Sequence, residues 1–381
     1  MSHGRWTGSV AAAMRLGSDL QADQCLAELA ANGQLDPLQA VFRAMPTNQS
    51  PMPPDAPEPL QRFFATQMAV PAWADQARIR RGEQVFLENG LPIAVVLLCK
   101  SIPEGYAAPA LTKVLYMTGL LQNRPLRRLL GVLQMVLDVA VDGGFEPDGK
   151  ALRVAMKLRL LHAGLRPIVV QNVPGYVAAH GVPCNHEDML ATVMGFSLVV
   201  VDGLQRLGAG LTQHEAEDLF YPWRFFCACM GIPEACIPTD LADAREFYAA
   251  YADRQYVPAD RNVEGVLLAQ AHTQMLRELL PPWTRALGLA RLPEVYMALL
   301  MGPEGCERLK IQKVDTNRLL GRFAKRAVQT AATQQAEPLH VVFAPLSRQL
   351  STAVYRTLIH KEFQGVPAII VPTKVADVWQ M

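Results

Sequence analysis

The stretch of residues 151 to 166, ALRVAMKLRLLHAGLR, constrains the fold more than any other part of the sequence. It has no proline and no glycine before Gly164, and it is rich in Leu, Ala, Met, Arg and Lys, so it predicts a helix. One face of that helix, at 3.6 residues per turn, carries small and charged side chains where a core-facing helix usually carries Leu or Ile. The residues on this face are Leu152, Ala155, Arg159, His162, Ala163 and Arg166.

This face presents a histidine with one arginine a turn before it and another a turn after it. Ala155 and Ala163 leave room beside the imidazole for something flat and bulky. An imidazole that binds a metal and guanidinium groups that bind carboxylates suit a haem, whose iron takes a nitrogen ligand and whose propionates bind arginines. A satisfied core histidine or a surface histidine explains the same residues, and the helix alone leaves these alternatives open.

The rest of the chain is a series of helical runs separated by Gly, Pro and Asn turn signals, without regular strand alternation or an internal repeat. The predicted fold class is therefore mainly α, a single large helical domain. Two runs near the C-terminus, LHVVFAPL and VPAIIVP within residues 338–372, fit either short β pieces or tail packing. The expected helices are two short ones over 9–44, then 61–90, 106–121, 126–141, 152–166, 187–207, 213–230, 240–256, 263–279, 292–301 and 307–331. Residues 91–100 fit a strand or a buried helix, and the alanine-rich run after them favours the helix.

The proline-rich run MPTNQSPMPPDAPEPL, residues 45–60, predicts an extended connector. It divides the chain into N-terminal helices with their connector over 1–60, a helical domain over 61–300 and a basic C-terminal extension over 301–381. Within that extension, residues 307–328 carry seven Lys or Arg against two acids, interleaved with Leu and Phe. Such a helix can contact a membrane surface or a partner, although a solvated face over a core is the more common case.

Composition limits the function classes. Half of the 381 residues are hydrophobic and 19% are charged, which excludes a disordered chain. The net charge of +1 gives no general attraction to nucleic acid. The most apolar run, residues 189–204, is interrupted by Gly195 and Asp202, so we expect no transmembrane segment. Seven cysteines, an odd number in mostly apolar surroundings, and a poor signal-peptide pattern predict a cytoplasmic protein.

Several familiar catalytic and cofactor motifs are absent from the sequence. It has no Rossmann glycine motif, P-loop, nucleophile elbow, H-E-x-x-H or C-x-x-C-H motif for covalent haem. Cys227, Cys229 and Cys236 lie among apolar residues and fit a buried thiol cluster better than a zinc site. The candidates that remain are His162 and Arg128, which could share a pocket if their helices form an antiparallel pair.

The sequence resembles the haem-dependent oxygenases grouped with the fungal MpaB oxygenase and the bacterial latex-clearing proteins. The resemblance spans residues 81–231. The stretches that carry it, in order, are RGEQVFLENGLP, SIPEGYAAPA with YMTGLL, RRLLGVLQMVLDV, LRLLHAGLR, GVPCNHEDMLATVMGFS and YPWRFFCACMGI.

The resemblance implies a mainly helical fold around one non-covalently held haem b. It implies that His162 is the axial ligand of the iron and that Arg128 is the family's characteristic arginine on the preceding helix. Arg159 and Arg166 are assigned to the haem propionates from their helix spacing, not from the resemblance.

This sequence departs from the rubber-cleaving members at three positions. They carry a threonine four residues after the arginine, a lysine beside it and a glutamate upstream, where this chain has Val132, Gly131 and Thr112. No catalytic distal base can therefore be assigned, and the nearest acids in the sequence, Glu104 and Asp138, have no pattern that favours them. Because distal polar groups decide what a haem does, the resemblance does not carry the reaction over intact.

The leading prediction is a haem b-dependent oxygenase that uses O2 to oxidise or cleave a lipophilic, unsaturated or isoprenoid substrate. One alternative is a non-catalytic haem-binding sensor or carrier, which the missing polar groups favour. Another is a haem-free helical interaction protein that binds through residues 307–328. The sequence does not specify the substrate, the product, the electron source or the oligomeric state.

Overall fold

A computed structural model of the chain describes residues 4–68, 70–117, 124–141, 143–208, 210–280, 289–315 and 371–372. The described residues form helices, turns and connectors, and they contain no strand. The α-helices are α1 (Gly8–Leu16), α2 (Leu20–Ala31), α3 (Leu38–Ala44), α4 (Glu58–Gln67), α5 (Gln76–Glu88), α6 (Gly90–Val96), α7 (Ile102–Gly105), α8 (Pro109–Met117), α10 (Pro125–Ala140), α11 (Ala151–Asn172), α12 (Tyr176–His180), α13 (His186–Phe196), α14 (Leu198–Leu207), α15 (Gln213–Cys229), α16 (Leu241–Gln255), α17 (Val263–Leu279) and α19 (Leu292–Arg308). The shorter elements are a π-helical turn, η1 (Leu97–Ser101), and two 3-10 turns, η2 (Glu234–Cys236) and η3 (Ala259–Arg261).

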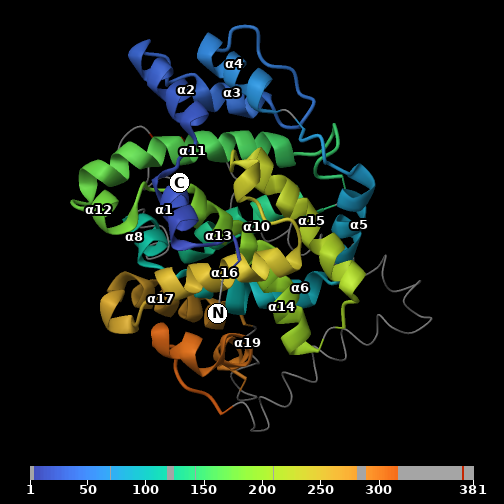
Figure 1. Cartoon of the computed structure of the whole chain (residues 1–381), viewed down its shortest axis with the longest axis vertical. Helices are drawn as coiled ribbons and strands as arrows, with labels where there is room; N and C mark the ends of the chain where they lie inside the picture. The colour runs from blue at the N-terminus through green and yellow to red at the C-terminus, as the bar shows by residue number, and fades with distance from the viewer. Residues whose placement is uncertain are drawn as a thin grey trace.

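Helix α11 separates two layers of the molecule. The N-terminal helices α2, α3 and α4 lie on one side of it, and α10, α13, α16 and α17 lie on the other side (Figure 1). One continuous hydrophobic core runs from Trp6 to Val371 and includes residues of all three segments predicted from the sequence. The mainly α, single-domain prediction is confirmed, and the exact segment boundaries stay a prediction.

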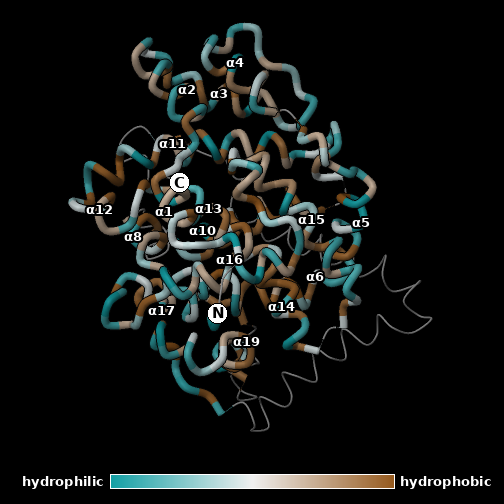
Figure 2. Tube along the Cα trace, in the orientation of Figure 1, coloured by the Kyte–Doolittle hydropathy of each residue, from teal (hydrophilic) through white to brown (hydrophobic). Residues whose placement is uncertain are grey.

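Polar caps fix where several helices begin. The side chain of Asn185 accepts a hydrogen bond from the Asp188 amide at 2.9 Å, as its position before an apolar run predicts. Thr212 and Glu215 form a reciprocal capping box at the start of α15. Most helices carry both hydrophilic and hydrophobic residues around their turns (Figure 2), as expected of helices with one buried face.

The N-terminal segment differs from its prediction. Residues 9–44 form three helices rather than two, because Asp19 caps a new helix after a break at Gly17 and Ser18. The connector over 45–60 contains no helix before Glu58, as predicted.

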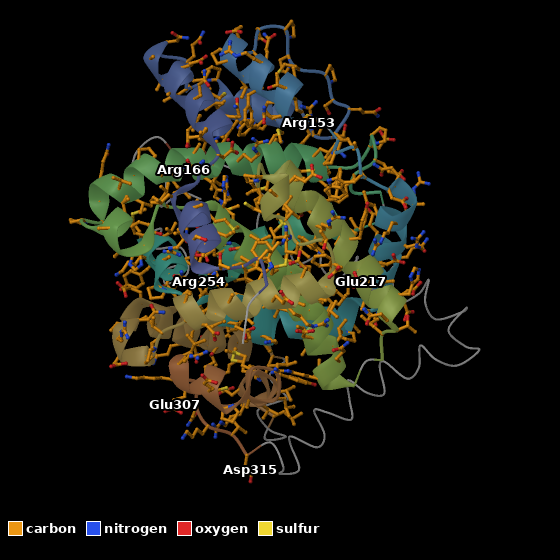
Figure 3. All side chains as sticks on the ribbon, viewed as in Figure 1. Arg153, Arg166, Glu217, Arg254, Glu307 and Asp315 are labelled. Atoms are coloured by element: carbon orange, nitrogen blue, oxygen red, sulfur yellow. The ribbon has the colours of Figure 1, made fainter. Side chains whose placement is uncertain are left out.

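Two cations of α11 hold this connector and the end of α3 in place. Arg153, 7% exposed, donates to the carbonyl oxygens of Thr47 and Ser50, and Lys157 donates to that of Phe42 at 2.8 Å. These carbonyl groups lie at and after the C-terminal end of α3, where positive charge is favourable. In Figure 3, Arg153 and Arg166 are labelled near opposite ends of α11, and both bind residues of the N-terminal layer.

The run predicted as one helix over 187–207 is two helices. Its helical conformation is interrupted at Ser197, so α13 and α14 pack on each other. By length and composition the combined stretch His186–Leu207 could cross a membrane. However, 78% of its most apolar window is buried inside the protein, as expected of a core helix pair.

The C-terminal prediction is only partly covered by the described residues. Helix α19 kinks at Gly302 and ends at Arg308, and residues 309–315 are not helical, so no helix begins at 307. Most of the predicted basic helix and both β-like runs up to residue 370 lie outside the described residues. Val371, 5% exposed, and Pro372 pack against Gly164 of α11, where an added Cβ atom would lie 2.6 Å from the Pro372 carbonyl oxygen.

Candidate functional site

His162 lies in the middle of α11 with its side chain partly buried. Its ring makes no hydrogen bond or ion pair with any residue that the structure describes. Burial, with smaller contributions from the cations Arg166 and Arg128, lowers the pKa of His162 to about 3. The imidazole is therefore neutral near pH 7 and keeps a nitrogen lone pair available for a ligand.

Arg128 lies in the first turn of α10, and its side chain is partly buried. A cation in the first turn of a helix is mildly unfavourable, so the sequence predicts a partner for it. The guanidinium forms no hydrogen bond or ion pair within the described part of the chain. Burial lowers the pKa of Arg128, and Tyr106 acts in the opposite direction. A partly buried cation without a described carboxylate partner favours an anionic ligand.

Tyr106 is a site residue that the sequence analysis did not single out. It directly follows α7, is 2% exposed, and its hydroxyl group is buried without a hydrogen-bond partner in the described residues. Its backbone carbonyl accepts from the Asn262 side chain at 2.8 Å, and its ring meets His272 edge-on at 6.0 Å. Burial raises the pKa of Tyr106, and Arg128 lowers it. The only sequence signal was its place in SIPEGYAAPA.

The two other predicted site residues have partners in the N-terminal layer. Arg159, 3% exposed, donates from Nη2 to the Asp19 carboxylate at 2.9 Å. Arg166, 6% exposed, donates from Nε to the Asp23 carboxylate at 2.8 Å. In this structure both arginines fasten α2 to α11, and their assignment to haem propionates stays a prediction.

A second histidine deserves comparison with His162. His186, at the start of α13, has a buried Nε2 atom without a partner among the described residues. Its Nδ1 atom faces Gly17, where an added Cβ would lie 2.7 Å away. Burial lowers the pKa of His186. Across the described residues, no three His, Cys, Asp or Glu side chains form a group that could hold a metal ion.

The positions that differ from the rubber-cleaving pattern offer no free polar group. Thr112 is fully buried, and its hydroxyl donates to the Asn262 side chain at 2.9 Å. Gly131 and Val132 lie within α10 and bring no hydrogen-bonding side chain. Glu104 is paired with Lys100 at 2.7 Å, and Asp138 accepts from Gln134 at 2.7 Å. Neither acid is therefore a free base in this structure.

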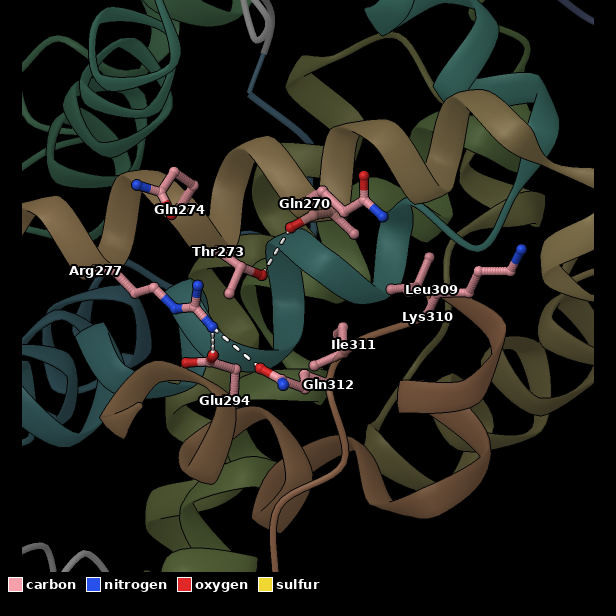
Figure 4. Close-up of a pocket in the computed structure, with 10 residues that line it drawn as sticks. Gln270, Thr273, Gln274, Arg277, Glu294, Leu309, Lys310, Ile311 and Gln312 are labelled. Atoms are coloured by element: carbon pink, nitrogen blue, oxygen red, sulfur yellow. Dashed lines mark hydrogen bonds and ion pairs between the residues drawn. The ribbon is translucent and has the colours of Figure 1, made fainter. Parts of the chain in front are cut away.

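Two surface cavities lie away from these residues. One, of about 300 Å³, lies between α17 and α19, where Arg277 contacts Glu294 and Gln312 (Figure 4). The other, of about 470 Å³, lies beside α4 and is lined by residues that include Phe64 and Arg153. Neither is lined by His162 or Arg128, so the candidate site rests on the chemistry of the buried side chains.

Comparison with known proteins agrees with this picture. A model of the catalytic domain described as ER-bound oxygenase mpaB/B′ and rubber oxygenase matches residues 93–333. The chain belongs to this oxygenase family. The match contains Tyr106, Arg128 and His162, whereas helices α1 to α5 lie outside it.

Individual relatives of this family are distant in sequence. The chain is 22% identical to the rubber oxygenase of Streptomyces sp. (strain K30) over 298 residues, which covers 72% of this chain and 71% of that protein. The structure of the latex clearing protein LCP in the closed state superposes with a TM-score of 0.73 at 19% identity, covering 88% of this chain and 90% of that one. The similarity to the latex clearing protein structure establishes that this chain has the same fold.

Proposed function

We propose that this family member is a haem b-dependent oxygenase that uses O2 to oxidise or cleave a lipophilic, unsaturated substrate of the polyisoprenoid kind. Membership in an oxygenase family and similarity to a rubber oxygenase support the reaction class. The finer assignment rests on the buried residues of α10 and α11.

The observation that carries the proposal is a neutral imidazole and a guanidinium, both partly buried and both without a partner among the described residues. Haem needs a nitrogen donor for its iron and cations for its propionates. His162 fits the first need because its lowered pKa keeps the ring unprotonated. Arg128 fits the second because no described carboxylate occupies its guanidinium. His162 and Arg128 therefore fit a haem.

A bound haem would supply the oxygen chemistry, which no amino-acid side chain provides. His162 would hold the iron, and Arg128 would bind and orient an anionic group. Leu129 and Leu133, which follow Arg128 on α10, are buried apolar residues at 5% and 6% exposure. A dry, apolar surrounding with Val132 in place of a polar side chain suits a hydrophobic substrate. Arg159 and Arg166 would take part only after leaving Asp19 and Asp23.

A haem-binding sensor or carrier is the second candidate. It is favoured by one observation, that Thr112 is engaged by Asn262 while Gly131 and Val132 add no polar side chain. Oxygen uptake that depends on an added alkene would distinguish the enzyme from the sensor. We also propose a cytoplasmic location, which the seven cysteines without disulfide bonds support.

The direct test is the absorption spectrum of the purified protein with haem b, before and after reduction. We expect a Soret band that shifts on reduction in the wild type and is lost or strongly altered in His162→Ala. His186→Ala is the matched control, because His186 is also partly buried and its Nε2 lacks a partner among the described residues. A variant lacking His162 that keeps the wild-type spectrum, or a loss of haem only in His186→Ala, would show that the ligand is wrongly assigned.

A further inference from the structure

The hydroxyl of Tyr106 is a donor without an acceptor. It is buried, and within the described residues it has no hydrogen-bond partner. Tyr106 is fixed at two points: the Asn262 side chain donates to its backbone carbonyl at 2.8 Å, and the His272 ring lies edge-on to its ring at 6.0 Å. His272 is itself fixed by a contact of 2.8 Å between its Nε2 and the Leu98 carbonyl oxygen. An isolated buried hydroxyl is unfavourable, and phenylalanine would fill the same space without that cost.

The second donor near this hydroxyl is the guanidinium of Arg128. Tyr106 packs against α17 through Asn262 and His272, and α10, which carries Arg128, packs against the same helix. Tyr106 and Arg128 each influence the ionisation of the other, and Arg128 also influences His162. Arg128 has no described acceptor either. Packing on α17, together with these mutual electrostatic influences, places two donors without described acceptors, one of them charged, in the same region of the fold as His162.

We propose that the Tyr106 hydroxyl and the Arg128 guanidinium together bind one negatively charged group of a ligand held against His162. The inference deepens the proposed function and rests on it. Tyr106 is then a ligand-contacting residue that supplies a polar group absent from positions 112, 131 and 132. Two sources of the negative group share this chemistry, a propionate of the haem itself and a small anion that enters the site.

The experiment compares wild type, Tyr106→Phe and Tyr176→Phe. Tyr176 is the matched control because it is equally buried, at 2% exposure, but its hydroxyl donates to the Ala110 carbonyl at 2.9 Å. Thermal unfolding of the haem-free proteins comes first. We expect Tyr106→Phe to unfold at the wild-type temperature or above it, and Tyr176→Phe to unfold below it. A clear loss of stability in Tyr106→Phe would overturn the proposal, because the hydroxyl would then have a structural partner.

Haem titrations then separate the two sources, with haem b, haem b dimethyl ester and azide as probes. If the pair binds a propionate, Tyr106→Phe weakens haem b about tenfold to a hundredfold, the range for a hydrogen bond to a charged group, and the dimethyl ester abolishes the difference. If the pair binds an entering anion, haem uptake is unchanged and azide affinity falls by the same factor.

The remaining outcomes each overturn a defined claim. Equal haem and azide affinities in wild type and Tyr106→Phe would overturn the role of Tyr106 and leave the haem proposal standing. A wild-type protein that takes up no haem would overturn the proposed function, and this inference would fall with it. Equal losses in Tyr106→Phe and Tyr176→Phe would show a general packing effect and would also overturn the role of Tyr106.

Discussion

The guanidinium of Arg159 forms a buried ion pair with Asp19, and the same carboxylate caps helix α2 by accepting from the Ala22 amide at 3.2 Å. One side chain of the N-terminal layer therefore both starts its own helix and fastens it to the helix that carries His162. The two residues are 140 positions apart in the chain.

The first prediction concerns this ion pair. Asp19→Asn removes the negative charge beside a guanidinium that is 3% exposed, and it should lower the free energy of unfolding by about 3 kcal/mol, as removal of one partner of a buried pair does. Urea unfolding measures the effect. Asp23→Asn is the control, because the Asp23 side chain is 32% exposed and its pair with Arg166 should contribute less. Equal losses in both variants would contradict the special role of Asp19.

The second prediction concerns Arg128. Arg128→Met removes a buried charge that has no described partner while keeping much of the side-chain volume. It should leave the haem-free protein as stable as wild type or more stable by about 1 kcal/mol. The same variant should bind haem more weakly. Arg124→Met, at an exposed position in the preceding turn, should change neither. Calorimetry without haem tests the predicted stability, and a haem titration tests the predicted loss of affinity. If haem-free Arg128→Met were less stable than wild type, Arg128 would have a structural partner.

The third prediction concerns the contact between α5 and α15. A Cβ atom at Gly82 would lie 2.1 Å from the Asp218 carbonyl oxygen and 2.6 Å from the Pro222 ring, so Gly82→Ala should destabilise the protein by about 3 kcal/mol. Gly131→Ala is the control, because apart from its own helix no described atom lies within 4 Å of an added Cβ there. That helix-interior change should stabilise by up to about 1 kcal/mol. The denaturant midpoints of both variants measure these changes in stability. If Gly82→Ala were as stable as wild type, α5 and α15 would pack less closely than the structure shows.

The fourth prediction concerns pH. Burial lowers the pKa of His272 to about 4 from an ordinary value of 6.5. Between these values the unfolded chain binds a proton that the folded protein excludes, so stability present above pH 6.5 is lost as the pH falls toward 4. His272→Gln keeps a donor for Leu98 without this titration. Relative to that variant, the haem-free wild type should lose at most about 3 kcal/mol by pH 4. If the difference in stability between wild type and His272→Gln did not change with pH, the lowered pKa of His272 would be contradicted.

Local patterns in the sequence predicted most helices, because their signals lie within one turn of each other. Asn185, whose side chain caps α13, shows this. Helix α11 was predicted to end near Arg166 but continues to Asn172 through Pro167, since tertiary packing outweighs the lost hydrogen bond. The break at Ser197 was missed for a similar reason, because the apolar run continues across it.

The site was predictable only where its chemistry was visible in one helix. Helix spacing placed Arg159 and Arg166 on one face, but it could not reveal that Asp19 and Asp23 of a distant helix hold them. Tyr106 was missed because a tyrosine in an apolar run is ordinary in sequence. Only the fold shows that its hydroxyl is buried without an acceptor near Arg128.

The contact between Gly164 and Pro372 has a consequence for synthesis on the ribosome. The helix that carries His162 leaves the exit tunnel some two hundred residues before the segment that packs against its back. During that interval Val371, which is part of the hydrophobic core, has not been synthesised and cannot pack against α11. Nascent chains should therefore pass through a stage in which this helix has formed its N-terminal contacts but is still uncovered, and a C-terminal deletion that removes Val371 should hold the protein at that stage.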